Sequence, residues 1–223
     1  MRAIALLPFV IFASILSAQV PKSSVEGMKI IFSDSFSEKS LGLYQFSDSS
    51  QWVVTKNGKS GKDMKCMGGG ADLSKTFIPS EMALIKGLEV GDFVMEFDFV
   101  QRGKDFNLRD VCVIYGYADA NTFYFAQAAS EETKYTHNTF SVENGKPRKI
   151  GTSRNQGVLW DYEKWQSVVL VRQTATRSVQ LYVDGQLVVE TAADEGRSGL
   201  IGIGTFGSEF KVDNLKVWAP DNK

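Results

Sequence analysis

Two acidic side chains, Glu96 and Asp98, stand one residue apart in a run of alternating apolar and polar residues. Alternate residues of a β-strand project to the same face of a sheet, so these carboxylates are expected to share a surface. Two carboxyl groups about 5–5.5 Å apart can act as nucleophile and acid/base in retaining cleavage of a glycosidic bond. The alternative is a solvent-facing polar row on an ordinary strand.

The chain has a single histidine, His137, in a polar segment between Thr136 and Asn138. An imidazole there could serve as a general base or as a hydrogen-bond partner for a sugar. The alternative is a loop histidine that is exposed or satisfied locally. No G-x-S-x-G nucleophile elbow accompanies it. Glu96, Asp98 and His137 are therefore the candidate catalytic residues, provided that they converge in one cleft.

Aromatic, amide and guanidinium side chains recur together in the middle of the chain. This combination suits carbohydrate, because a ring stacks on the C–H face of a sugar while planar donors bind pairs of hydroxyls. For each residue the alternative is packing in the core. The candidate carbohydrate-binding residues are Arg102, Tyr115, Tyr117, Tyr124, Gln127, Arg148 and Trp160.

Metal-binding chemistry has one candidate pair, Asp34 and Asp213, near the two ends of the chain. Carboxylate oxygens are the ligands that calcium takes, so these two could hold a calcium ion if their segments lie side by side. The alternative is that each caps a turn. With two cysteines and one histidine, a zinc site is not expected.

The amino terminus predicts export. Arg2 precedes an apolar run over 3–16 and the small pair Ser17-Ala18, which is the pattern of a secretory signal peptide. An uncleaved anchor is the alternative, although the run is short for about 30 Å of hydrocarbon. We expect cleavage after Ala18, a secreted or periplasmic product without membrane insertion, and one domain over 19–223.

Composition limits the partners. The chain is 43% hydrophobic and 12% aromatic, as in a globular protein, and its formal net charge is −1. A nearly neutral chain lacks the basic field that binding to nucleic acid requires, so nucleic acid is not an expected partner. Cys66 and Cys112 form one disulfide in an oxidising compartment or stay as two buried thiols, and the sequence leaves both open.

Strand patterns fill the rest of the chain. Four short β patterns with turns between them run from Trp165 to Trp218, which is typical of an antiparallel β-sandwich. Asn57-Gly58 and Asn144-Gly145 predict hairpin turns. The segment 75–88 predicts loop and strand, and the long stretch 141–165 predicts a loop of functional interest. Earlier strands are expected at 29–32, 52–55, 93–100, 111–117, 122–128 and 139–142.

Several of these segments resemble a known fold family. The matching motifs are FSDSF at 32–36, GDFVMEFDF at 91–99, WQSVVLVR at 165–172, LYVDG at 181–185, GLIGIG at 199–204 and VDNLKV at 212–217. Together they resemble concanavalin A-like lectin/glucanase domains, close to the laminin-G-like domains of secreted bacterial proteins. The resemblance implies an all-β, two-sheet antiparallel jelly-roll sandwich with one convex and one concave sheet.

A narrower resemblance covers NTFYFAQ at 121–127, HNTFSV at 137–142, Pro147-Arg148 and Trp160. These are similar to exported jelly-roll proteins grouped with family 16 glycoside hydrolases and 3-keto-disaccharide hydrolase-type domains. Gln127 stands where that subgroup has a histidine. Gln101 occupies the acid/base position of the family 16 pattern E-x-D-x-x-E, and an amide cannot protonate a leaving oxygen.

The sequence therefore favours binding of an extracellular polysaccharide or oligosaccharide on the concave sheet face. One alternative is a glycoside hydrolase or polysaccharide lyase that uses Glu96, Asp98 and His137. The other is a protein-interaction or scaffold domain.

Overall fold

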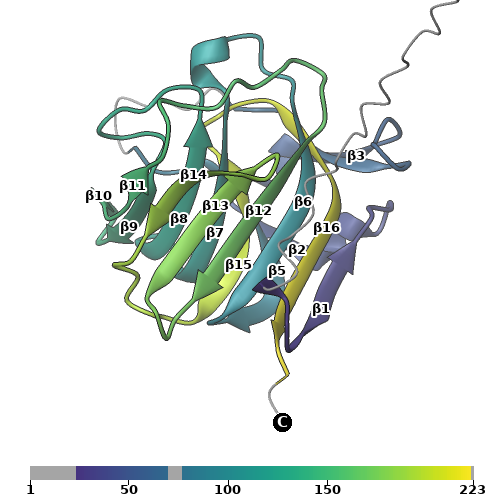
Figure 1. Ribbon diagram of the computed structural model, residues 1–223. Helices are drawn as coiled ribbons and strands as arrows, with labels where there is room; N and C mark the ends of the chain where they lie inside the picture. The colour runs from purple at the N-terminus through teal and green to yellow at the C-terminus, as the bar shows by residue number, and fades with distance from the viewer. Residues whose placement is uncertain (1–23, 70–76, 222–223) are drawn as a thin grey trace, which may run out of the picture.

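The computed structural model describes residues 24–69 and 77–221, and the predicted signal peptide lies outside them. Two antiparallel sheets lie one behind the other (Figure 1). The first is nine-stranded, in the order β11 (Thr152–Ser153), β14 (Gln186–Thr191), β13 (Ser178–Val183), β12 (Gln166–Gln173), β6 (Phe93–Gln101), β16 (Phe210–Pro220), β4 (Asp63–Cys66), β3 (Trp52–Thr55), with β1 (Met28–Asp34) beside β16.

The second sheet is seven-stranded, in the order β10 (Lys146–Lys149), β9 (Thr139–Glu143), β8 (Thr122–Ala129), β7 (Asp110–Asp119), β15 (Gly199–Thr205), β5 (Glu81–Val90) and β2 (Tyr44–Phe46). Among the described residues, short 3₁₀ helices occur at η2 (Ser40–Leu43), η3 (Ser49–Gln51) and η4 (Phe106–Leu108). None of the helices in the described residues is long and apolar enough to cross a bilayer.

The main core lies between the sheets, and β6 shows how the sequence builds it. Four alternate side chains of this strand, Phe93, Met95, Phe97 and Phe99, are fully buried in the core. The intervening Glu96 and Asp98 therefore lie on the outer face of the nine-stranded sheet. The predicted alternation is confirmed.

A second apolar cluster covers the outer face of the seven-stranded sheet. It contains the buried side chains Met82, Leu84, Cys112, Ile114, Phe123, Phe125, Phe140, Val142 and Phe206. Strands of this sheet are therefore buried on both faces, which explains their long apolar runs.

The predicted turn at Asn57-Gly58 lies in the longer loop 56–62, which joins β3 to β4. The predicted turn at Asn144-Gly145 is confirmed and joins β9 to β10, and Asp184-Gly185 of the LYVDG motif joins β13 to β14. The residues of these last two turns have positive φ, between 48° and 76°. Such backbone angles give the tight turn whose twist matches the paired strands, and they are the reason for Asn, Asp and Gly at these positions.

The chain before residue 91 contains strands that the sequence patterns do not predict. Strand β2 pairs with β5 at the edge of the seven-stranded sheet, and β4 lies between β3 and β16 in the nine-stranded sheet. The predicted strand within 75–88 corresponds to β5, which runs from Glu81 to Val90. Cys66 and Cys112 are both free and buried, one in the core and the other in the outer apolar cluster. Of the two alternatives, the structure has two separate thiols.

Candidate functional site

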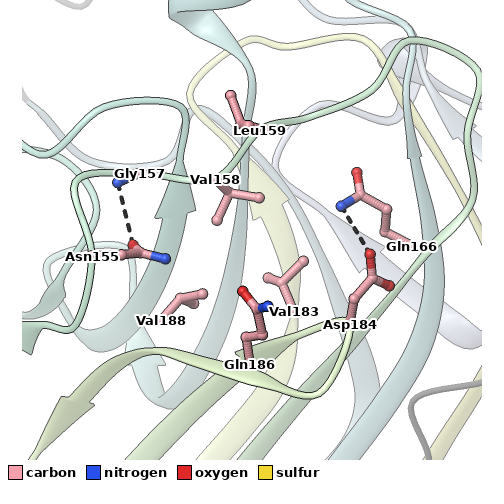
Figure 2. A pocket seen from close by; sticks show the side chains of 9 residues that line it. All are labelled: Asn155, Gly157, Val158, Leu159, Gln166, Val183, Asp184, Gln186 and Val188. Carbon is pink, nitrogen blue, oxygen red and sulfur yellow. Dashed lines mark hydrogen bonds between the residues drawn. The ribbon is translucent and has the colours of Figure 1, made fainter. Parts of the chain in front are cut away.

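A pocket of about 260 Å³ opens at the end of the sandwich where β12 begins, between the loop after β11 and the β13–β14 turn. The predicted loop over 141–165 contains β10 and β11 in its first part, and its remainder after β11 forms one wall of the pocket. Figure 2 shows the lining residues, which are Asn155, Gly157, Val158, Leu159, Gln166, Val183, Asp184, Gln186 and Val188.

The lining divides into an apolar floor and a polar rim. Val158, Val183 and Val188 are buried and belong to the core between the sheets. Above them stand three amides and one carboxylate, and the described lining contains no cationic side chain. This chemistry offers hydrogen bonds to hydroxyl groups and an apolar surface to C–H groups, while it is unfavourable for an anion.

The Asn155 amide has a fixed orientation. Its Oδ1 accepts hydrogen bonds from the Gly157 amide at 3.2 Å and pairs with Nε2 of His137 at 2.6 Å. Nδ1 of His137 accepts from the Ala129 amide at 3.2 Å, so the imidazole proton resides on Nε2 and is donated to Asn155. Both donors hold the oxygen, which leaves Nδ2 of Asn155 on the opposite side of the amide, toward the pocket (Figure 2).

His137 is itself held from behind the pocket. Its backbone amide donates to Oε1 of Gln127 at 3.1 Å, and Nε2 of Gln127 donates to Asp110 at 2.7 Å. The histidine is fully buried, and burial lowers its pKa. A neutral, enclosed imidazole cannot contact a ligand directly, so its role is to position Asn155.

Asp110 anchors this polar network. Its carboxylate also accepts hydrogen bonds from the Thr205 hydroxyl at 2.5 Å and from the Phe206 backbone amide. Burial raises the pKa of Asp110 to about 6, although these hydrogen bonds oppose the shift. The network joins strands β7 and β8 to the segment after β15.

The opposite wall of the pocket is fixed by Asp184. Its Oδ1 accepts from the Ser167 backbone amide at 2.9 Å, and its Oδ2 accepts from Nε2 of Gln166 at 3.2 Å. The turn is thereby attached to the start of β12. Among the described residues, neither the side-chain amide of Gln186 nor Nδ2 of Asn155 has a hydrogen-bond partner. Both groups can therefore bind a ligand.

The candidate catalytic residues do not form one cleft. Glu96 and Asp98 lie on the outer face of the nine-stranded sheet, whereas His137 adjoins the seven-stranded sheet. The carboxylate of Asp98 accepts hydrogen bonds from Nζ of Lys59 at 2.6 Å and from Nδ2 of Asn214 at 2.8 Å. Burial raises the pKa of Glu96, with Lys216 acting in the opposite direction.

Gln101 does not face the same way as the two carboxylates. It is buried, and its Nε2 donates to the carbonyl oxygen of Asp110 at 2.7 Å. Glu96, Asp98 and His137 therefore do not converge in one cleft, which was the condition for their acting together. The two carboxylates fit the alternative of a polar row on a strand.

The predicted carbohydrate-binding residues do not gather on one sheet face. Three aromatic ones, Tyr115, Tyr124 and Trp160, are buried in the core, where a sugar cannot reach them. Gln127 is buried in the network behind the pocket. Core packing, the stated alternative, holds for the three rings.

The remaining predicted binders lie apart from one another. Arg102 is paired with Glu163 at 2.9 Å beside η4. Arg148 is exposed on β10, 3.7 Å from Glu195, and the Tyr117 ring packs against Phe123 on the outer apolar cluster. Only Arg102 lies at the pocket end of the molecule.

Asp34 and Asp213 lie on paired strands, as expected, but each has its own donors. Asp34 accepts hydrogen bonds from the Phe36 amide and the Ser40 hydroxyl, both at 2.8 Å. Asp213 accepts from the amide and hydroxyl of Ser60 at 2.7 and 2.9 Å. No cluster of three or more metal-ligating His, Cys, Asp or Glu side chains occurs among the described residues. The arrangement fits turn capping rather than a shared calcium ion.

The pocket residues Asn155, Gln166, Asp184 and Gln186 were not identified as binders from the sequence. Two signals were available: the patternless loop before Trp165, which the sequence marked as functional without naming a residue in it, and the Asp-Gly turn, which appeared only within a fold motif. These residues are brought together by the pairing of β12 with β13 and of β13 with β14. This pairing places the β13–β14 turn beside the loop that precedes β12.

Neither a protein-family model nor a curated protein matches this chain. Solved structures do share its fold. The carbohydrate binding module CBM66 from Bacillus subtilis matches with a TM-score of 0.55 at 14% identity, covering 79% of this chain and 96% of its own. Domain 4 of AbnA, an extracellular arabinanase from Geobacillus stearothermophilus in complex with arabinotriose, matches with a TM-score of 0.54 at 10% identity, over 87% and 94%.

Peanut lectin matches with a TM-score of 0.51 at 13% identity, covering 86% of this chain and 97% of its own. At these identities the likeness concerns the fold. The chain has the fold of a two-sheet antiparallel jelly-roll sandwich, as the motifs implied.

Proposed function

We propose that this protein is an exported carbohydrate-binding module that holds a neutral saccharide in the pocket at the end of the sandwich, without covalent chemistry. Similarly folded proteins include a carbohydrate binding module, an arabinanase domain in complex with arabinotriose and a lectin. Fold alone is a weak warrant for function, so the proposal rests on the chemistry of the pocket.

The observation that carries the proposal is the fixed amide of Asn155 above an apolar floor. Two donors hold its oxygen, so no ligand has to reorient the amide before binding its nitrogen. Such preorganisation lowers the entropic cost of binding. Gln186 and the carboxylate of Asp184 complete a rim of donors and acceptors suited to hydroxyl groups.

Export is part of the proposal and rests on the sequence over 1–18. A secreted or periplasmic protein meets polysaccharides outside the cytoplasm, and these are the proposed source of the ligand. A direct check is the subcellular fraction and the N-terminal residue of the expressed chain, with Gln19 expected first.

Binding of the mature domain to a glycan array tests the function. Gln186→Ala and Asn155→Ala are each expected to weaken binding about threefold to tenfold, the worth of one hydrogen bond. Gln180→Ala is the matched control, because this amide lies on β13 but does not line the pocket. A chelator is expected to leave binding unchanged.

Product analysis of every array hit separates binding from catalysis. Recovery of the intact ligand supports the proposal. Shortened or unsaturated products would make the protein a hydrolase or lyase, and a lack of binding across the array would point to a protein partner.

A further inference from the structure

Exposed apolar side chains gather beside the pocket. Leu159 is 81% exposed, Leu108 50%, Tyr162 49% and Phe106 40%. These four residues, called here the rim surface, come from η4 and the loop that forms the pocket wall. Exposed apolar patches with polar surroundings mark places where another molecule binds.

Arg109 joins the two parts of the rim surface. Its guanidinium carbon lies 5.5 Å from the centre of the Phe106 ring and 5.6 Å from that of Tyr162. Its Nη1 donates to the Trp160 carbonyl at 2.7 Å, and its Nε donates to the Gly103 carbonyl at 2.9 Å. One nearly buried side chain thus holds both rings and the pocket loop.

The rim surface is continuous with the pocket. The Trp160 amide donates to the Val158 carbonyl at 3.0 Å, which makes a tight turn with Leu159 at its tip. Leu159 lines the pocket, and Tyr162 follows three residues later, so their Cα atoms are at most about 11 Å apart. A ligand longer than one sugar ring would meet these side chains as it leaves the pocket.

Charge at this end favours an uncharged ligand. The guanidinium carbon of Arg102 lies 5.2 Å from the centre of the Tyr162 ring, but the charge of Arg102 is balanced by its ion pair with Glu163. Arg109 has its donors directed to backbone oxygens, and the pocket itself contributes only the carboxylate of Asp184.

From this geometry we infer that the ligand is a neutral oligosaccharide or polysaccharide chain held by one end. The terminal ring occupies the pocket, and the following rings lie on the rim surface, where Tyr162 and Phe106 stack on their C–H faces. The inference rests on the proposed function and adds to it the length and charge of the ligand.

Calorimetric titration with neutral gluco-, xylo- and arabino-oligosaccharides, from mono- to hexasaccharide, tests the inference, with oligogalacturonates as acidic counterparts. In the wild type we expect affinity to rise about threefold to tenfold from the monosaccharide to the longer chains, the worth of an aromatic contact. Tyr162→Ala is expected to abolish this gain and to leave monosaccharide affinity unchanged. Tyr162→Phe should keep the gain, and Leu43→Ala, which removes a different exposed apolar side chain, should have no effect.

Several outcomes would overturn the inference while leaving the proposed function intact. These are an affinity independent of chain length, equal weakening of short and long ligands by Tyr162→Ala, or tighter binding of the acidic series. Self-association that Tyr162→Ala abolishes would assign the rim surface to a second copy of the chain. A complete lack of saccharide binding would overturn the proposed function as well.

Discussion

At the scale of single residues, Asp110 links the pocket network to the pH dependence of stability. Its pKa is raised by burial to about 6, so the folded protein binds this proton more tightly than the unfolded chain. The stabilisation from this proton is fully present below about pH 4 and is lost as the pH rises through about 6.

Asp110→Asn removes this titration. We expect the free energy of unfolding of the wild type, relative to the variant, to fall by about 2 kcal/mol between about pH 4 and pH 7. His137 titrates in both proteins, and its lowered pKa acts in the opposite sense, with stability lost as the pH falls. Urea denaturation at a series of pH values measures the difference, and a constant difference would contradict the raised pKa.

Arg172 and Asp194 form a buried ion pair at the opposite end of the sandwich from the pocket. Both side chains are fully buried, and two nitrogens of Arg172 contact Asp194 at 2.7 and 3.2 Å. Arg172→Met leaves the carboxylate buried without its partner, so we expect a loss of about 3–5 kcal/mol in the free energy of unfolding. Urea denaturation measures this loss.

Lys164→Met is the matched control for that variant. The Lys164 pair with Asp161 is 3.4 Å long, and both side chains are mostly exposed. Its loss is expected to change the free energy of unfolding by less than about 1 kcal/mol. Similar values for the two variants would show that the buried pair contributes little.

At the scale of the elements, β15 depends on glycine where it passes between β5 and β7. A Cβ atom on Gly202 would lie 2.1 Å from the carbonyl oxygen of Ala83, which is backbone and cannot turn aside. Gly202→Ala is therefore expected to destabilise the protein by about 1–3 kcal/mol. Gly42→Ala in η2 is the control, because no atom lies within 4 Å of its added Cβ. Equal melting temperatures for the two variants would refute this account.

The same elements show what the sequence could predict. The alternation of apolar and polar residues correctly predicted strand β6 and which of its side chains face the core. Four large apolar side chains at every second position are buried together only if the segment is a strand. Alternation failed on β7, where Tyr115 and Tyr117 should share a face. Gly116 has a φ of 54° within a register shift, so Tyr115 enters the core and Tyr117 packs on the outer cluster.

At the scale of the whole molecule, the pocket depends on contacts that no local pattern encodes. Asn155, Gln166 and Gln186 come from one loop and two strands that meet because the nine-stranded sheet orders its strands β14, β13, β12. The motifs could identify the sandwich, since strands and turns are local. They could not show which strands are neighbours or which loops meet at one end of the sandwich. For this reason the residues predicted as one site lie apart in the structure.

The central claim is that a saccharide occupies the pocket at the end of the sandwich. The most direct measurement is the change in side-chain amide resonances of the mature protein when a panel of neutral mono- and oligosaccharides is added. We predict that the NH₂ groups of Asn155, Gln166 and Gln186 shift, while that of Gln180 on β13 does not. Saturating ligand that leaves these three groups unshifted, or that shifts only groups on the outer face of a sheet, would contradict the account.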